Sequence, residues 1–261
     1  MNNNYNLYQE LESKISVTKE PYPYSVINNF LPVNIAEKIS SEFLIPNKNN
    51  FKVSTQEYQK TKIALNDLKL MPDSIKEIIL KLYSDEFLKI LEKKFNYKKL
   101  ISDWDLVGGG MHESFTGGFL KVHTDFLLRK EKKLKRCLNL IIYFNKNWNP
   151  KWNGALELWD KDMKNNFLKL QPNINTAIIF QTSGISNHGF PEPLRCPAEI
   201  SRKSIALYYY IPYTEDLEFE RKTNNLFTMF KRRPRWNFLK VKEIKSKNFI
   251  SRIINKIFYK F

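Results

Sequence analysis

Three residues have the types and the spacing of a metal site: His123, Asp125 and His188. His123 and Asp125 form the tripeptide His-Thr-Asp, and a strand that continues through it would place both side chains on one face. His188 follows later, after the apolar run 177–180. Two imidazoles and one carboxylate are a facial ligand set for non-haem Fe(II), which leaves positions open for O2 and a co-substrate. The alternative is that the tripeptide is fortuitous and these histidines are ordinary surface or core residues.

An arginine downstream strengthens the interpretation as a metal site. Arg202 and Ser204 lie at the start of the last strongly apolar segment, and they share a face if that segment is a strand. A planar guanidinium that is always charged suits capture of a carboxylate by two parallel hydrogen bonds, and the neighbouring hydroxyl adds a second donor. The pair is therefore a candidate clamp for a dicarboxylate. The alternative for Arg202 is a strand residue that faces solvent.

The apolar residues change period once along the chain, and this change predicts the elements that position the site. The segment 22–27 is rich in aromatic and β-branched residues and is predicted as an edge strand, because an edge tolerates its proline. Helical spacing is seen over 33–44 and over 75–91, where Asp73 or Ser74 is the predicted cap. Strand-like runs then follow at 118–122, 138–144, 155–159, 176–180 and 204–211. Short strands at this spacing favour a sandwich or jelly roll.

Length and composition limit the class of protein. The chain has 261 residues, a formal net charge of +16 and 42% hydrophobic residues, which is enough to build one large domain with appendages. The longest strongly apolar run, 205–211, is far shorter than the roughly 18 residues of a membrane span. Cys137 and Cys196 lack the spacing of a thiolate zinc site. These features, with an N-terminus unlike a secretory signal, lead us to expect a cytoplasmic protein.

The positive charge is concentrated at the C-terminal end. Residues 220–261 contain 13 Lys or Arg against Glu220 and Glu243, so a basic tail follows a nearly balanced body. Apolar residues at helical spacing over 249–261 predict an amphipathic helix there. Its apolar face either packs on the core or lies on an anionic membrane surface, with peripheral contact through residues 246–261. The basic run 130–136 is interpreted as a solvated loop, and we expect no nucleic-acid partner.

The segment Gly108 to Ile211 resembles the double-stranded β-helix of 2-oxoglutarate- and Fe(II)-dependent oxygenases, specifically the prolyl 4-hydroxylase-like group. Five motifs occur in the same order: His123-Thr-Asp125, Tyr143-Phe-Asn145 followed by Trp148, Gly154-Ala-Leu-Glu-Leu-Trp159, His188-Gly189, and Arg202-Lys-Ser204. The strand at 21–31 also resembles the one that opens such proteins. The resemblance therefore covers roughly residues 20–213.

The resemblance implies a fold and a set of roles. The expected fold is α+β and mainly β: a jelly-roll, cupin-like core at 100–213, N-terminal helices within 1–99 packed on one sheet, and a basic helical tail at 214–261. Carried over by position, His123, Asp125 and His188 bind iron, and Arg202 with Ser204 binds the distal carboxylate of 2-oxoglutarate. Tyr143 adds a hydroxyl to the co-substrate pocket, and Asn139 is a further candidate because it shares a strand face with Tyr143. Ascorbate is left open as an additional reductant.

The implied reaction is hydroxylation of an unactivated C–H bond, in which 2-oxoglutarate and O2 give succinate and CO2. The substrate is left open between a prolyl residue in a peptide and a small-molecule, lipid or glycan-linked metabolite. Halogenases of similar architecture replace the carboxylate ligand with a small residue, so Asp125 argues against that chemistry. A non-catalytic cupin-like binding protein is the remaining alternative. The long interval between His188 and Arg202 predicts a loop that intrudes near the metal.

Overall fold

A computed structural model describes residues 6–43, 55–213 and 228–231. Four α-helices lie in the described part of the chain: α1 (Leu7–Lys14), α2 (Val33–Glu42), α3 (Asp73–Leu82) and α4 (Asp85–Phe95). The longer strands are β1 (Tyr24–Asn28), β3 (Gln59–Leu65), β5 (Gly110–Thr124), β7 (Leu134–Tyr143), β8 (Leu156–Trp159), β9 (Asn166–Leu170), β10 (Thr176–Gln181), β11 (Asn187–Phe190) and β12 (Arg202–Pro212). Two-residue strands complete the set: β2 (Thr55–Gln56), β4 (Ile101–Ser102), β6 (Leu128–Arg129) and β13 (Met229–Phe230).

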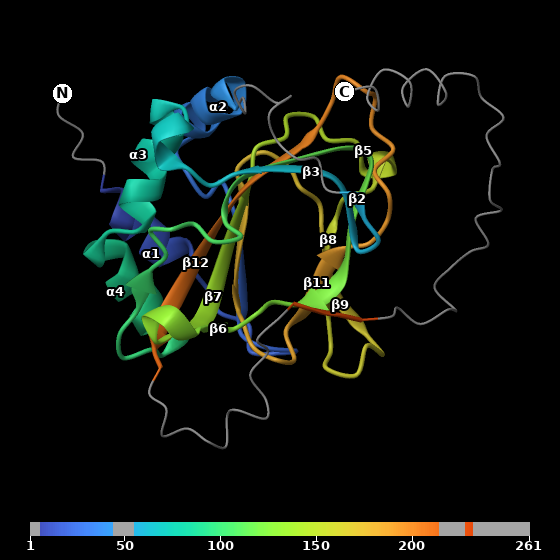
Figure 1. The fold of residues 1–261 in the computed structure, drawn as a ribbon. Helices are drawn as coiled ribbons and strands as arrows, with labels where there is room; N and C mark the ends of the chain where they lie inside the picture. The colour runs from blue at the N-terminus through green and yellow to red at the C-terminus, as the bar shows by residue number, and fades with distance from the viewer. Residues whose placement is uncertain (1–5, 44–54, 214–227, 232–261) are drawn as a thin grey trace, which may run out of the picture.

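The strands form one antiparallel sheet that curls round a central space (Figure 1). Its main path runs β1-β10-β7-β12-β5-β11-β8-β9, and β3 pairs with the long strand β5. The helices lie together on the side of β7 and β12, as Figure 1 shows. This arrangement is the predicted double-stranded β-helix with N-terminal helices packed on one sheet, and the prediction of the fold is confirmed. β1 lies at the end of the main path, as expected of an edge strand.

Alternation along β7 separates the core from the central space. Leu138, Leu140 and Ile142 belong to the main hydrophobic cluster, which also contains the buried faces of the four helices. Asn139 and Ile141 point the other way and line a cavity enclosed by the curled sheet. The apolar side chains of this strand therefore hold it against the helices, and its remaining residues are free to build a site.

The N-terminal region departs from the sequence prediction in two ways. The helix predicted over 75–91 is two helices, because Ser84 starts α4 by accepting a hydrogen bond from the Phe87 amide at 3.4 Å. The predicted caps at Asp73 and Ser74 are wrong: α3 begins after Pro72 with no side-chain cap, and Ser74 is buried. The region between the two predicted helical segments, for which no strand was predicted, contains β3. The sequence analysis also missed α1, β9 and β11.

The C-terminal predictions fall mostly outside the described residues. Residues 246–261, for which the amphipathic helix and the membrane contact are predicted, lie there entirely. The described piece 228–231 contains a short strand, β13, that pairs with the end of β5. Among the described helices none has the length and apolar character needed to cross a membrane.

The loop between His188 and Arg202 does not reach the metal ligands. Leu194 exchanges backbone hydrogen bonds with Gly117 and Gly118 at the bend of β5. It also packs with Trp148 and Cys196 in a separate apolar cluster. None of residues 191–201 lines the central cavity. The predicted intrusion is wrong because the loop has its own apolar anchor outside the barrel.

Candidate active site

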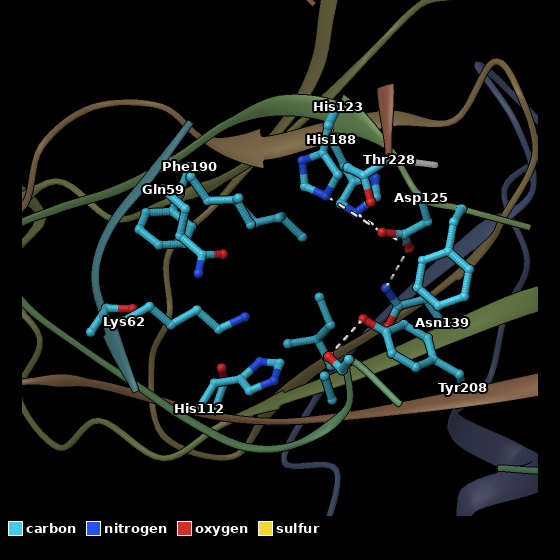
Figure 2. Close-up of a pocket in the computed structure, with 18 of the residues that line it drawn as sticks. Gln59, Lys62, His112, His123, Asp125, Asn139, His188, Phe190, Tyr208 and Thr228 are labelled. Atoms are coloured by element: carbon cyan, nitrogen blue, oxygen red, sulfur yellow. Dashed lines mark hydrogen bonds and ion pairs between the residues drawn. The ribbon is translucent and has the colours of Figure 1, made fainter. Parts of the chain in front are cut away.

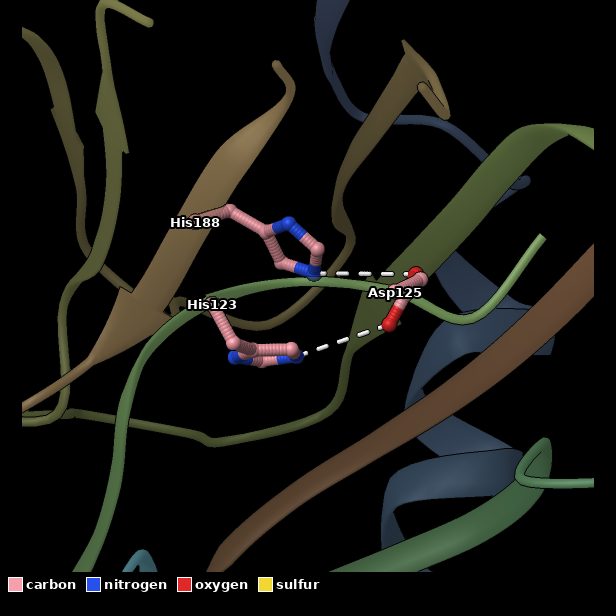
Figure 3. Close-up of side chains that lie close together, drawn as sticks. All are labelled: His123, Asp125 and His188. Carbon is pink, nitrogen blue, oxygen red and sulfur yellow. Dashed lines mark ion pairs between the residues drawn. The ribbon is translucent and has the colours of Figure 1, made fainter. Parts of the chain in front are cut away.

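His123, Asp125 and His188 converge at one end of the cavity (Figure 3). Asp125 Oδ1 lies 3.4 Å from His123 Nε2, and Asp125 Oδ2 lies 3.8 Å from His188 Nε2. One ligand atom from each residue lies within 4.8 Å of the others, and all three side chains are buried. Imidazole nitrogens and a carboxylate oxygen at this separation suit a divalent transition metal bound on one face. The structure thus brings together the three ligands that the sequence predicts.

Strand pairing explains why residues so far apart in sequence meet. His188 on β11 lies directly opposite His123 on β5, and directly opposite residues share a sheet face. Gly189 permits this close pairing, since a Cβ there would lie 2.8 Å from the Leu120 carbonyl oxygen. β5 ends at Thr124, so Asp125 follows the strand directly and turns its carboxylate toward both rings.

Backbone carbonyls fix the tautomer of both imidazoles. His123 Nδ1 lies 2.8 Å from the Lys121 carbonyl oxygen, and His188 Nδ1 lies 2.9 Å from that of Ser186. A carbonyl oxygen can only accept, so Nδ1 carries the proton on each ring and Nε2 presents a lone pair. Outer hydrogen bonds of this kind orient metal-bound histidines. The donor set therefore fits Fe(II) in both its chemistry and its protonation.

Burial and charge set the ionisation of the ligands. Burial, together with His123 and Arg136, lowers the pKa of His188 to about 4, so that the ring is neutral near pH 7. Burial alone would raise the pKa of Asp125, but the two imidazoles and the Arg136 guanidinium hold it well below its ordinary value. Both groups are therefore in the state that binds a metal cation.

Arg136 is a site residue that the sequence analysis assigned to a solvated loop. It is buried, lies 3.6 Å from Asp125 Oδ2 and stacks between the rings of Phe126 and Tyr208. Its Nη2 also donates to the Val107 carbonyl oxygen at 3.1 Å. The solvated-loop interpretation is wrong for this residue, because the end of the basic run enters β7 and turns inward.

Arg202 is placed as a clamp would require. Its Nε donates to the Gly154 carbonyl oxygen at 2.8 Å, and its Nη2 donates to the Tyr143 hydroxyl at 3.3 Å. The ring of Phe190 covers it, with the guanidinium carbon 4.2 Å from the ring centre. The side chain is buried yet has no carboxylate partner among the described residues, which leaves the remaining donors for an anion. A buried guanidinium that has no carboxylate partner in the described part of the chain is suited to bind one carboxylate of a dicarboxylic acid.

The other predicted site residues lie round these groups. Ser204 is cross-strand to Tyr143 and lines the cavity. Tyr143 contacts Arg202 through its hydroxyl but is not itself part of the cavity wall. Asn139 does line the cavity, and its Nδ2 donates to Asp125 Oδ2 at 3.5 Å while its buried Oδ1 has no partner. Asn139 thus lies closer to the metal ligands than to the clamp.

The cavity between these groups has a volume of about 320 Å³, within the range of pockets that bind small molecules. Lys62 of β3 and His112 of β5 form its far wall (Figure 2). His112 was not assigned to the site from the sequence, and the structure places it on the cavity wall. Lys62 was not singled out at all.

β13 covers the side of the cavity near His123. Phe230 pairs with His123 in the strand register, and their ring centres are 5.5 Å apart. Its other neighbour is Tyr58, whose ring stacks on it at 4.3 Å. Phe230 and Thr228 both line the cavity. A piece of the basic C-terminal region is therefore part of the site, which its composition alone did not indicate.

Comparisons with known proteins agree with this site. A family model described as the 2OG-Fe(II) oxygenase superfamily matches residues 110–210, which span β5 to β12. The fold is similar to a prolyl 4-hydroxylase from Pseudomonas putida, with 14% identity, a TM-score of 0.52, and coverage of 80% of this chain and 100% of that one. It is also similar to a prolyl 4-hydroxylase from Phytophthora capsici, with 18% identity, a TM-score of 0.55, and coverage of 80% and 67%. A search of curated protein sequences gave no significant match.

Proposed function

We propose that the chain, whose residues 110–210 match the family model of the 2OG-Fe(II) oxygenase superfamily, hydroxylates a C–H bond of an organic substrate, using Fe(II), 2-oxoglutarate and O2. The observation that carries the proposal is a single cavity that holds two groups of side chains. One group is the set of metal-ligand candidates, His123, Asp125 and His188, and the other is the guanidinium of Arg202, which has no carboxylate partner among the described residues. The chain is an enzyme, so the non-catalytic binding protein considered from the sequence is set aside.

The residues present fit the iron and the co-substrate. His123, Asp125 and His188 would hold Fe(II) through two neutral Nε2 atoms and one carboxylate oxygen. Arg202 would hold the distal carboxylate of 2-oxoglutarate, with Ser204 beside it as a second donor. Bound together, iron, 2-oxoglutarate and O2 supply an oxidant strong enough to remove hydrogen from an unactivated C–H bond.

The remaining residues of the cavity orient and protect this chemistry. Arg136 and Asn139 contact Asp125 Oδ2, so that the carboxylate keeps one orientation toward the imidazoles. Phe190 and Phe230 cover Arg202 and His123 and exclude water from them. Asp125 fills the position that a halogenase would leave to chloride, which favours hydroxylation. The prolyl residue considered from the sequence stays a prediction, because likeness to prolyl 4-hydroxylases at these identities concerns the fold.

The test is an assay of 2-oxoglutarate turnover with ¹⁸O-labelled O2. The protein is incubated with Fe(II) and 2-oxoglutarate, and the succinate is analysed by mass spectrometry, first alone and then with candidate substrates. We expect slow succinate formation alone, and faster formation with a substrate that itself gains one ¹⁸O atom. Absence of iron-dependent succinate formation under both conditions would contradict the proposed function.

A further inference from the structure

The walls of the cavity carry more positive charge than the iron and co-substrate use. Among the described residues, the charged side chains that line it are the cations Lys62, Arg136 and Arg202 and the carboxylate of Asp125. A divalent metal ion and the two carboxylates of 2-oxoglutarate cancel one another. Two positive charges therefore remain on the walls of the loaded site, and a cavity of this sign attracts anions.

Lys62 faces the cavity because the pairing of β3 with β5 is irregular next to it. The pairing of β3 with β5 shifts register between Lys60 and Lys62, and the intervening Thr61 has a φ of 48°. That conformation is strained for a β-branched residue. Thr61 alone stands opposite residues 115–118, so the extra residues belong to β5. The positive φ of Thr61 interrupts the alternation along β3, and Gln59 and Lys62, three positions apart, both line the cavity. The strand thus tolerates strain at the point where it turns an ammonium group inward.

The ammonium group has no partner there. Figure 2 shows the Lys62 side chain extending from β3 toward the centre of the cavity. In the described part of the chain it makes no hydrogen bond or ion pair. Burial and the charge of Arg202 lower its pKa to about 8. An unpaired cation of this kind weakens the fold unless something outside the chain neutralises it.

His112 presents a second unused group beside Lys62. It lies on β5, the strand that pairs with β3, and its Nε2 is buried without a partner. Figure 2 shows the His112 ring at the same wall of the cavity as Lys62. The backbone of Gly108 and Gly109 hydrogen-bonds the His112 ring, so the single proton of the neutral ring lies on Nδ1 and Nε2 presents a lone pair. A lysine can donate three hydrogen bonds, so Lys62 is the donor at this wall that is available to an oxyanion.

We propose that Lys62, with His112 beside it, binds a carboxylate or phosphate group of the primary substrate. This inference rests on the proposed function, because it assigns 2-oxoglutarate to Arg202 and the metal. Lys62 and Arg202 both lie opposite Ser114 in the sheet register, one on each side of it. Their backbones are thus two strands apart, about 9.6 Å at the usual strand spacing. The substrate anion and the co-substrate carboxylate occupy separate positions in the cavity.

The test measures the binding of two anions to the loaded protein. Ni(II) replaces Fe(II) to prevent turnover, and 2-oxoglutarate is kept saturating so that the metal and Arg202 are occupied. Acetate and inorganic phosphate are then titrated separately by isothermal calorimetry, to distinguish a carboxylate site from a phosphate site. The variants are Lys62→Met, Lys62→Arg and the control Lys60→Met, which removes the same charge from an exposed position of β3.

We expect at least one probe to bind the wild-type protein at a single site. Lys62→Met should weaken that binding about tenfold or more, the usual effect of losing a hydrogen bond to a charged group. Lys62→Arg should retain most of the affinity, and Lys60→Met should match the wild-type protein. The affinity for 2-oxoglutarate should change much less in Lys62→Met than the affinity for the probe.

Three outcomes would overturn the proposal: neither probe binds, Lys62→Met binds the probe as the wild-type protein does, or Lys62→Met loses 2-oxoglutarate as strongly as it loses the probe. The last would place Lys62 on the co-substrate. The binding assay needs no turnover. Missing succinate formation therefore contradicts the proposed function, and missing probe binding in a protein that forms succinate contradicts this inference alone.

Discussion

Two walls of the same cavity differ in whether the chain itself provides hydrogen-bond or ion-pair partners for their polar side chains. On the metal wall, both histidines are oriented by a carbonyl oxygen, and Asp125 is held by Arg136 and Asn139. On the wall formed by β3 and β5, Lys62 has no partner among the described residues and His112 leaves a buried nitrogen unpaired. The first wall is preorganised by the chain itself, whereas the second leaves its polar groups for a ligand.

The largest effect should follow from removing a ligand on the metal wall. His188→Ala deletes one of the three side chains that can hold the iron, so uncoupled succinate formation should fall more than about 100-fold, beyond the range seen for outer-sphere partners. Asp162→Ala, an exposed carboxylate outside the cavity, is the control. If His188→Ala formed succinate at the wild-type rate, His188 would not be an iron ligand.

The clamp should give the next largest effect. Arg202→Ala removes charge-assisted hydrogen bonds to 2-oxoglutarate, so its KM should rise about 30- to 100-fold. The KM of Arg202→Lys should lie between those of the wild-type protein and Arg202→Ala. Lysine keeps the positive charge but lacks the two parallel N–H groups of the guanidinium. Arg195→Ala, which is exposed and outside the cavity, should behave as the wild-type protein. An unchanged KM in Arg202→Ala would contradict the assignment of Arg202 as the clamp.

The unpaired cation on the opposite wall should affect the stability of the ligand-free protein. Lys62→Met removes an uncompensated ammonium, so the free energy of unfolding of the ligand-free protein at pH 7 should rise by about 1 kcal/mol. Urea denaturation measures this change. Destabilisation by a similar amount would show that Lys62 is paired in the folded state, and the contrast between the two walls would fail.

The difference in unfolding free energy between Lys62→Met and the wild-type protein should depend on pH. The pKa of Lys62 is about 8 in the folded protein against an ordinary value of 10.5, so the unfolded chain binds more protons between these values. The stability contributed by this group therefore rises with pH from about 8 to about 10.5. The advantage of Lys62→Met should be largest below pH 8 and disappear above 10.5. A constant advantage across that range would contradict the account of Lys62.

Loss of the contact between Tyr58 and Phe230, which holds β13 over the metal ligands, should give the smallest effect. Tyr58 and Phe230 stack at 4.3 Å, and Tyr58 is 41% exposed. A double-mutant cycle of Tyr58→Ala and Phe230→Ala, measured by urea denaturation, should give a coupling energy of about 0.5 kcal/mol, the low end for aromatic pairs. A coupling energy of zero would mean that β13 is not held over the site by this contact.

The metal wall could be predicted from the sequence because its signals are local. The tripeptide that begins at His123 places two ligands on one face through strand alternation. His188 is conspicuous because histidine is rare in this chain, and Arg202 because it is a charge at the start of an apolar strand. The strands that carry them are apolar enough to be found by their period. Fold class and the candidate ligands therefore follow from short stretches of sequence.

Arg136 and Lys62, the two cavity cations that were not predicted from the sequence, face the cavity for the same physical reason. β7 shifts register against β12 between Tyr209 and Tyr210, which leaves Cys137 unpaired and turns Arg136 into the cavity. The irregular pairing of β3 with β5 at Thr61 does the same for Lys62. A bulge changes the alternation by one residue, and strict alternation along a strand then assigns the wrong face. Glycine at 118 was the available hint, since a Cβ there would clash with Thr61 Oγ1.

The most direct test of the central claim is an anaerobic titration of the protein with Fe(II), with and without 2-oxoglutarate, followed by the visible charge-transfer absorption of the iron chelate. We predict one Fe(II) bound per chain, an absorption band that requires 2-oxoglutarate, and loss of both in Asp125→Ala. A wild-type protein that shows no saturable band, or an Asp125→Ala variant that shows the same band, would contradict the assignment of His123, Asp125 and His188 as the iron site.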